Sequence, residues 1–525
     1  MRTLVTFLLT LLAASALSAQ ERLDSAGIDR LIDARLSAEG VAAAPPADDS
    51  EFLRRLSLDT RGTIPSVEET IAFLADRSPE KRAEAIERFL ADPKRGEAWG
   101  AYWDKVLIGN FEGANNQMVR MGAKSLFREW VAEQFNQNTP YDKFAEAIIT
   151  AEGQVRESPQ GLPTLRYRES VADLSGSMTR VFLGKQVQCA QCHNHPYDEN
   201  LTQQDFWELA AFFDRTKARP VRDENGRFAG FNISEVPRGR TFIPDTSPRV
   251  EVQPVWLDGT KGPIGLAAQR RESYVTMLTY HDREQFARNM ANRLWAHYFG
   301  RGLVEPVDDW QNPYATPSHP ELMEALATEF LAADLDIRHL ERLVLNTRTY
   351  QRGSTADAVQ RARADLFAAA PLRPLTPDQL FNSIDAATNL SSLAANRPAA
   401  AAFPDALRLR YLAQFTFLFD NDEMEEVDTF EPNLSQALFM LNDKTLAQAV
   451  SNRGGSMIAE IIETTKDPGE QVAYLFLAAL SRRPSAEEAG AYAELLRSAA
   501  GTQRNRALED ILWVLVNSAE FRTNH

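Results

Sequence analysis

The chain has 525 residues, of which 44% are hydrophobic and 25% charged. This is the composition of an ordinary globular protein whose length suits two or three domains. Its formal net charge of −16 opposes binding to phosphate-rich polymers and anionic lipid surfaces, so no nucleic-acid partner is expected. With only two cysteines, a chain of this length depends on a large hydrophobic core rather than on disulfides.

Residues 1–19 have the layout of a cleavable secretory signal peptide. Arg2 provides a positive start, residues 4–12 are largely apolar, and small residues lead to Ala19. We expect cleavage after Ala19, with Ala16 as the alternative because Leu17 is large. No later apolar run approaches the roughly twenty residues that a bilayer span needs. The sequence therefore predicts an exported protein, periplasmic or extracellular, with no integral membrane segment in the mature chain.

The first helix after this segment is indicated by apolar residues at a spacing of four. Ile28, Ile32 and Leu36 recur at this interval, which lines one side of a helix. An Ala/Pro-rich stretch at residues 42–47 then interrupts the pattern. We therefore assign residues 20–50 to an N-terminal helix and its linker.

Side-chain caps predict where several later helices begin. Capping boxes, in which a Ser and an acidic residue three positions later satisfy backbone donors of the first turn, occur at residues 66–69 and 485–488. Residues 202–205 form a similar N-cap. Ser78-Pro79 is predicted to open another helix, and Asp92-Pro93 is predicted to end it.

Between the two helical parts the composition and the hydrophobic pattern of the sequence change. Gly and Pro become frequent from about residue 216, and residues 249–253 alternate polar and apolar side chains like a half-buried strand. Residues 228–233 are a second, weaker strand candidate. The predicted fold is mainly α, with a helical domain at 51–215, a small β-rich connector at 216–270 and a helical C-terminal domain at 271–525.

The most specific motif is the run Cys189-Ala190-Gln191-Cys192-His193, which contains both cysteines of the chain. Two thiols three residues apart, followed directly by an imidazole, match what covalent attachment of a c-type haem needs. Each thiol can add to a vinyl group of the porphyrin, and His193 can bind the iron as its proximal ligand. The motif lies in a short loop between two predicted helices.

Two other interpretations of the motif stay open. An oxidising compartment favours a structural or redox-active disulfide between Cys189 and Cys192. The two thiolates, His193 and a distant fourth ligand also suit tetrahedral Zn²⁺, and His195 is available nearby in the sequence. The sequence alone does not choose between haem, disulfide and zinc.

A haem at this motif needs a second axial ligand or leaves an open site. His319, in a Ser-His-Pro-Glu segment, is the candidate for that ligand or for a polar group that faces the loop. Its alternative role is to sit in the first turn of a helix capped by Ser318 with Glu321. His297 and Met178 are interpreted instead as core residues.

The loop also needs apolar cover if it holds a porphyrin. Residues 281–350 carry no cofactor motif of their own, and we expect them to pack over residues 189–196. Four aromatic side chains that follow the loop are further candidates for cover, namely Phe206, Trp207, Phe212 and Phe213.

The chain resembles a known pair of domains. Residues 183–196 and 209–213 resemble the core motif of an exported bacterial domain of unknown function, abundant in planctomycetes and often labelled cytochrome-like. Residues 52–59 and 98–103 resemble its start. The resemblance extends to the domain that usually follows it, through residues 286–295, 299–304, 317–322, 345–351 and 517–521. It implies a two-domain architecture and a haem-like motif, and it gives no substrate.

Other functions have weaker support in the sequence. No nucleophile elbow, H-E-x-x-H, Walker loop or dinucleotide fingerprint is present. The acidic run at residues 420–431 has oxygen ligands suited to Ca²⁺, but it lacks the Gly turn and ligand spacing of an EF-hand, so a solvated loop is the favoured interpretation. We therefore predict an exported haem c protein with a redox or electron-transfer role and an exported redox partner protein. The alternatives are a non-haem scaffold or binding protein with a disulfide or zinc site, and a polysaccharide-related hydrolase, which needs two opposed carboxylates.

Overall fold

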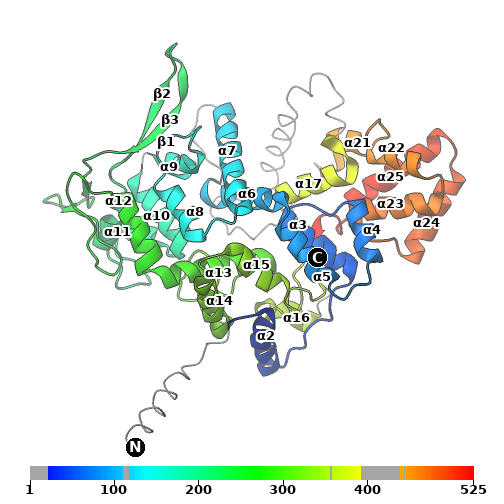
Figure 1. Ribbon diagram of the computed structural model, residues 1–525, viewed down its shortest axis with the longest axis horizontal. Helices are drawn as coiled ribbons and strands as arrows, with labels where there is room; N and C mark the ends of the chain where they lie inside the picture. Colours follow the sequence, from blue (N-terminus) through cyan, green and yellow to red (C-terminus); the bar gives the residue numbers. More distant parts are fainter. Residues whose placement is uncertain are drawn as a thin grey trace, which may run out of the picture.

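The computed structural model describes residues 22–109, 117–168, 170–354, 357–391, 438, 440–442 and 444–525. Helices make up most of it, which confirms the mainly α fold (Figure 1). Up to the connector, the helical elements are α2 (Ser25–Glu39), α3 (Asp49–Arg61), α4 (Val67–Ala75), α5 (Lys81–Leu90), α6 (Pro93–Leu107), α7 (Gln117–Asn136), α8 (Tyr141–Ile149), η1 (Pro159–Gly161), α9 (Leu162–Arg166), α10 (Val171–Leu183), η2 (Val187–Gln191) and α11 (Gln203–Ala210).

Helices return after the connector and continue to the end of the chain. They are α12 (Arg270–Thr276), the π-helical turn η3 (Met277–His281), α13 (Arg283–Phe299), α14 (Pro320–Ala332), α15 (Ile337–Leu345), α16 (Ala358–Ala362), η4 (Ala364–Leu366), α17 (Pro377–Thr388), α21 (Lys444–Ala449), α22 (Met457–Thr464), α23 (Pro468–Leu480), α24 (Ala486–Ser498) and α25 (Thr502–Val516). Within the described part of the chain, every helix is too short or too polar to cross a membrane.

The predicted caps are largely confirmed. Capping boxes open α4 at Ser66, α11 at Thr202 and α24 at Ser485. The start of α5 was predicted two residues too early, because the Ser78 hydroxyl accepts the backbone N–H of Glu80 and closes a local turn instead. Asp92 follows the end of α5, and its side chain also caps α6, so one residue marks both helix boundaries.

In the part of the chain that the structure describes, the strands form three small antiparallel sheets. One has the order β1-β3-β2, with β1 (Gly153–Gln154), β2 (Thr216–Arg222) and β3 (Phe228–Glu235). The strand predicted at 228–233 is therefore the centre of the largest sheet. The strand predicted at 249–253 shrinks to β5 (Glu251–Val252), because its partner β4 (Thr241–Phe242) offers only two residues. The third sheet pairs β6 (Arg373–Pro374) with β7 (Thr523–Asn524).

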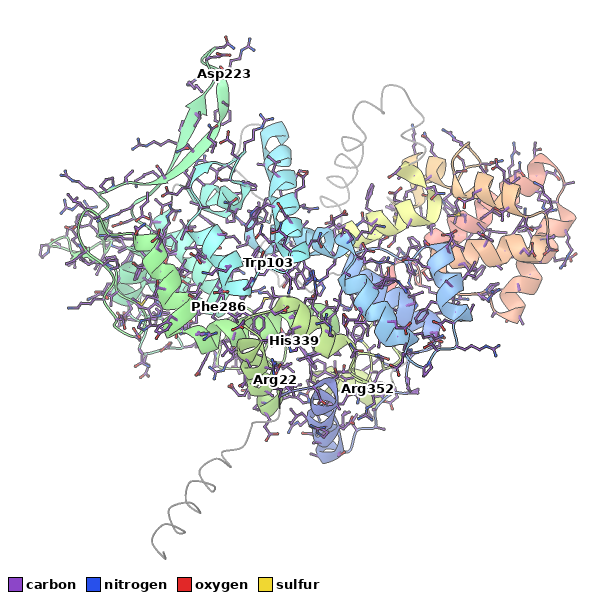
Figure 2. The ribbon with its side chains drawn as sticks, viewed as in Figure 1. Arg22, Trp103, Asp223, Phe286, His339 and Arg352 are labelled. Atoms are coloured by element: carbon purple, nitrogen blue, oxygen red, sulfur yellow. The ribbon has the colours of Figure 1, made fainter. Side chains whose placement is uncertain are left out.

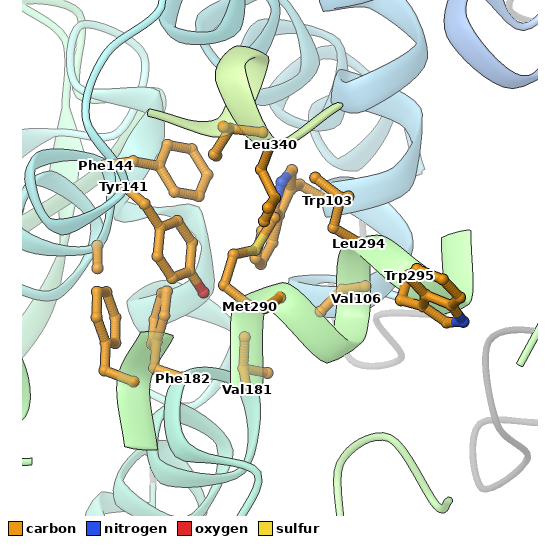
Figure 3. Close-up of a cluster of buried hydrophobic side chains, with 14 of the residues drawn as sticks. Trp103, Val106, Tyr141, Phe144, Val181, Phe182, Met290, Leu294, Trp295 and Leu340 are labelled. Atoms are coloured by element: carbon orange, nitrogen blue, oxygen red, sulfur yellow. The ribbon is translucent and has the colours of Figure 1, made fainter. Parts of the chain in front are cut away.

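A single hydrophobic core joins helices from both sides of the connector. It extends from Ile28 to Ala368 and combines α2–α11 with α12–α15. Figure 3 shows its centre, where Trp103 of α6 and Tyr141 of α8 meet Met290 of α13. The Tyr141 ring stacks on Phe286, with ring centroids 4.6 Å apart. Helices from both predicted helical domains thus share this core.

A second core lies at the other end of the molecule, around α17 and α21–α25 (Figure 1). It also takes in Leu58, Ile64 and Val67 from the N-terminal part of the chain. Helix α3 therefore contributes Phe52, Leu53 and Leu56 to the first core and Leu58 to the second. This helix connects the two halves of the structure.

One buried carboxylate ties α6, α13 and α15 together inside the first core. Glu341 of α15 accepts hydrogen bonds from Arg95 Nε (2.8 Å), Trp99 Nε1 (2.9 Å) and Tyr298 Oη (2.8 Å), and both members of the Arg95–Glu341 ion pair are fully buried. Burial, with the neighbouring carboxylate, raises the pKa of Tyr298 well above its usual value, so its hydroxyl stays protonated and donates.

Removing this carboxylate should destabilise the whole fold. Glu341→Ala leaves the Arg95 guanidinium buried without its partner, so we expect a loss of about 3–5 kcal/mol in the free energy of unfolding. Urea denaturation followed by circular dichroism measures it. Glu146→Ala, which removes one member of an exposed ion pair with Lys143, is the control and should cost less than about 1 kcal/mol. Equal losses of unfolding free energy in both variants would show that the buried carboxylate of Glu341 contributes no more to stability than an exposed one.

Candidate functional site

The Cys-x-x-Cys-His motif lies at the surface, in the loop between α10 and α11. Cys189 lies within η2, and Cys192 follows its last residue. Both cysteines are free thiols and both are exposed. The loop therefore offers two accessible thiols, three residues apart in the sequence.

His193 is exposed, and its ring is oriented by a hydrogen bond to the backbone. Its Nδ1 lies 2.7 Å from the carbonyl oxygen of Asn194. A carbonyl only accepts, so Nδ1 carries the proton, and Nε2 of the neutral imidazole has a free lone pair. This is the arrangement that metal-binding histidines usually show, with one ring nitrogen held by a carbonyl and the other available to the metal.

His195 has a different role, because it holds the turn of the loop together. It is buried, and its Nδ1 accepts the backbone N–H groups of Tyr197 (3.3 Å) and Asp198 (3.1 Å). Its own backbone N–H donates to the carbonyl of Leu201 (2.8 Å). The Nδ1 lone pair of His195 is thus used within the loop.

Helix α11 anchors the loop by hydrogen bonds. The Trp207 Nε1 and Gln203 Nε2 groups both donate to the carbonyl of Gln191, each at 3.1 Å, and the backbone N–H of Gln203 donates to Asn194 Oδ1. Of the aromatic residues expected to give cover, Trp207 is therefore the one with a direct hydrogen bond to the motif.

The other three aromatic side chains belong to the core. Phe206, Phe212 and Phe213 are at most 1% exposed. Phe212 and Phe213 contact Tyr274 of α12, with centroid distances of 5.9 and 4.7 Å, so they pack against the second helical part of the chain. These three side chains were expected to cover the loop. They are instead buried in the core.

The segment after α13 holds the two ends of the loop. The backbone N–H of Trp310 donates to the carbonyl of Gly184 (2.8 Å), and Gln311 Nε2 donates to Asp198 Oδ2 (2.9 Å). Gln285 of α13 also donates to the carbonyl of Leu183 (2.9 Å). Residues 281–350 thus contact the segments that flank the motif, at Leu183, Gly184 and Asp198. Their packing over residues 189–196 stays a prediction, and the motif's two thiols and its imidazole are exposed.

His319 lies in another environment, directly before α14. It is 4% exposed; its Nδ1 lies 3.1 Å from Ser318 Oγ and its ring centroid 5.5 Å from that of Phe367. Ser318 does not cap α14, since its hydroxyl donates to the carbonyl of Leu303. Burial, together with the Arg35 charge, lowers the pKa of His319 to about 4. None of these contacts involves residues 189–196.

The interpretation of His297 and Met178 as core residues is confirmed. His297 Nε2 is 3.0 Å from the carbonyl oxygen of Asp59, and its ring stacks on Trp99 with centroids 4.8 Å apart. Met178 is 1% exposed. Among the residues that the structure describes, no group of three or more His, Cys, Asp or Glu side chains is placed to hold a metal ion. The acidic run at 420–431 lies outside the described residues.

Two family models match the chain. Residues 27–218 match PSCyt2, described as a protein of unknown function (DUF1549), and residues 270–408 match PSD1, described as a protein of unknown function (DUF1553). The chain thus carries a DUF1549 region followed by a DUF1553 region, both of unknown function. The matched DUF1549 region contains the whole motif loop, and the DUF1553 region contains Trp310 and Gln311. Neither description names a cofactor or a reaction, and no curated protein or solved structure matches the chain.

The contact between the two domains at Gly184 can be tested with a matched pair of glycines. Gly184 and Gly40 both end helices, with φ of 67° and 66°. A Cβ at Gly184 would lie 2.4 Å from the Trp310 ring, whereas nothing lies within 4 Å at Gly40. Gly40→Ala should cost about 1–2 kcal/mol for the left-handed backbone alone. Gly184→Ala should cost a further 1–3 kcal/mol, roughly, from overpacking.

Urea denaturation of the two glycine variants measures this difference. In Gly184→Ala, alkylation of the two thiols by iodoacetamide should also change in rate, because the loop loses its fixed end. Identical stabilities for Gly40→Ala and Gly184→Ala would contradict the contact.

His319 should make the fold sensitive to acid. Its folded-state pKa of about 4 is below the ordinary value of 6.5, so between these pH values the unfolded chain binds more protons and stability falls as pH falls. We expect the drop in Tm from about pH 7 to about pH 5 to be smaller in His319→Asn than in the wild type. His281→Asn, at an exposed site, is the control. The same acid response in all three proteins would contradict this assignment.

Proposed function

We propose that the protein is an exported c-type haem protein with a redox or electron-transfer role, in which Cys189, Cys192 and His193 hold the haem. The observation that carries this proposal is the His193–Asn194 hydrogen bond, which leaves Nε2 free for iron beside two accessible thiols. Bound haem would supply reversible one-electron chemistry at its iron.

The residues of the loop fit the three tasks that such a site requires. The thiols are unpaired and exposed, as thioether formation with two vinyl groups requires. His193 presents Nε2 with its tautomer set by the carbonyl of Asn194. His195 and Trp207 hold backbone groups of the loop by hydrogen bonds, and Gln311 holds the side chain of Asp198, so the reactive atoms sit on a fixed base.

The exposure of the motif supports transfer to a partner rather than chemistry in an enclosed cavity. Cys189, Cys192 and His193 all face solvent. A group held at these atoms lies at the surface, where an exported redox partner protein can approach it. Solvent exposure also influences the reduction potential of a haem.

The direct test is haem content in a host that has a cytochrome c maturation system. The wild type should give a covalent haem band in gels and a pyridine haemochrome spectrum. Cys189→Ser and Cys192→Ser should each weaken covalent retention, since each removes one thioether, and the double variant should abolish it. His193→Ala should keep the covalent haem and shift the Soret band, and His281→Ala is the matched exposed control.

The other interpretations of the motif give different results in the same samples. A colourless protein without free thiols supports the disulfide scaffold, and zinc found by elemental analysis supports the metal site. If the wild type and both single Cys variants show the same spectrum without a Soret band, the haem proposal is wrong. Hydrolysis of a polysaccharide by colourless protein would favour the hydrolase alternative.

A further inference from the structure

A β-hairpin projects from the body of the molecule. Strands β2 and β3 form it, and Figure 2 shows Asp223 at its tip. The turn is closed by Asp223 Oδ1, which accepts the backbone N–H groups of Asn225 (2.9 Å) and Arg227 (2.8 Å). Strand β1 extends the sheet at its base, on the far side of β3.

The strand register divides this sheet into an apolar face and a polar face. Residues paired across neighbouring strands share a face. Ile233 is paired with Ala218 and Phe231 with Pro220, and Ile233 is 1% exposed within the first core. The opposite side is polar, with Arg219 paired to Asn232, Asn232 paired to Gln154, and Lys217 paired to Ser234. We call Gln154, Lys217, Arg219, Asn232 and Ser234 the polar face of the hairpin.

The charge of the hairpin is opposite to that of the chain. Residues 216–235, which form the hairpin, contain four basic and three acidic residues, whereas the whole chain has a formal charge of −16. Lys217 and Arg219 are exposed, and neither forms an ion pair with any residue in the described part of the chain. Lys217 Nζ has only the backbone carbonyl of Asp214 at 3.3 Å.

The amides on this face also have spare hydrogen-bonding capacity. Asn232 Nδ2 makes one long contact of 3.5 Å, to the neighbouring carbonyl of Ile233. The side-chain amide of Gln154 takes no hydrogen-bond partner among the described residues. An amide both donates and accepts, which suits hydroxyl groups, while Lys and Arg suit carboxylate or sulfate groups.

We infer that the polar face of the hairpin is a docking site for an extended acidic polysaccharide, one that carries carboxylate or sulfate groups. Lys217 and Arg219 are two residues apart on β2, so their side chains emerge about 6–7 Å from each other and can pair with successive acidic groups of a polymer. Asn232 and Gln154 continue the same row across the sheet and can bind its hydroxyls.

The composition of this face disfavours other anionic partners. A protein interface is centred on buried aromatic or aliphatic anchors, whereas the one apolar side chain of β2 on this side is Val221, a small, half-buried residue paired with Gly230. Insertion into a lipid surface likewise needs apolar side chains on the contacting face. The inference does not depend on haem binding, because none of the five residues belongs to the motif loop.

Affinity electrophoresis through gels that contain polygalacturonate, dextran sulfate or neutral dextran tests the inference. The full chain should be retarded by at least one acidic polymer and not by neutral dextran. The double variant K217S/R219S should bind about tenfold more weakly. The control R77S/K94S removes the same charge from exposed residues elsewhere and should change binding by less than about twofold. Gln154→Ala with Asn232→Ala should also weaken binding.

Three outcomes would overturn the inference. Equal weakening in both double variants would show diffuse attraction without a site. Aggregation of K217S/R219S with unchanged binding would show that the two cations only protect the exposed edge of β2, where Pro220 already blocks strand addition. No retardation by either acidic polymer, with binding instead to an acidic protein or to anionic vesicles, would assign the face to that partner.

Discussion

The rest of the structure depends on the buried charges of helix α3. Arg54 donates to the carbonyls of Ala479 and Phe521, and Arg55 donates to those of Tyr350 and Arg352. A guanidinium has five N–H donors and no acceptor, so its burial is tolerated only where oxygens surround it. Burial lowers the pKa of Arg54 to about 10, which still leaves it charged at neutral pH. The positions of these two side chains therefore fix where α23, the C-terminal residues and the segment after α15 must lie.

Asp59, on the same helix, is a buried carboxylate that accepts hydrogen bonds from distant parts of the chain. It accepts hydrogen bonds from Tyr350 Oη (2.9 Å), Arg373 Nη2 (2.7 Å) and Asn524 Nδ2 (2.6 Å). Two of these partners lie in β6 and β7, so the carboxylate brings together strands that are about 150 residues apart in the sequence. Because α3 also divides its apolar residues between the two cores, polar and apolar contacts of one helix set the relative placement of the two halves.

The two surfaces assigned a role here differ in how they are held. The motif loop is tied at its base by α11 and by the segment after α13, and its reactive atoms reach solvent. The hairpin is tied by Ile233 on one face and leaves the other face polar and free. In both cases the backbone is fixed by burial on one side, which lets the exposed side chains keep a defined geometry without a surrounding cavity.

The sequence by itself determined most of the helix caps, the mainly α fold, the loop position of the motif and the core roles of His297 and Met178, because these follow from local hydrogen bonds and from the spacing of apolar residues. It did not determine that one core spans both domains, that Trp310 and Gln311 hold the loop, or that Phe212 and Phe213 pack against Tyr274. Residues 310–311 lie outside any helical period, and their partners are more than 100 residues away. His319 shows the same limit, since a histidine before Pro320 has no local signal that tells whether its ring faces the loop or Phe367. Only the tertiary structure decides such contacts, because they depend on how separate elements pack and not on the preferences of either element alone.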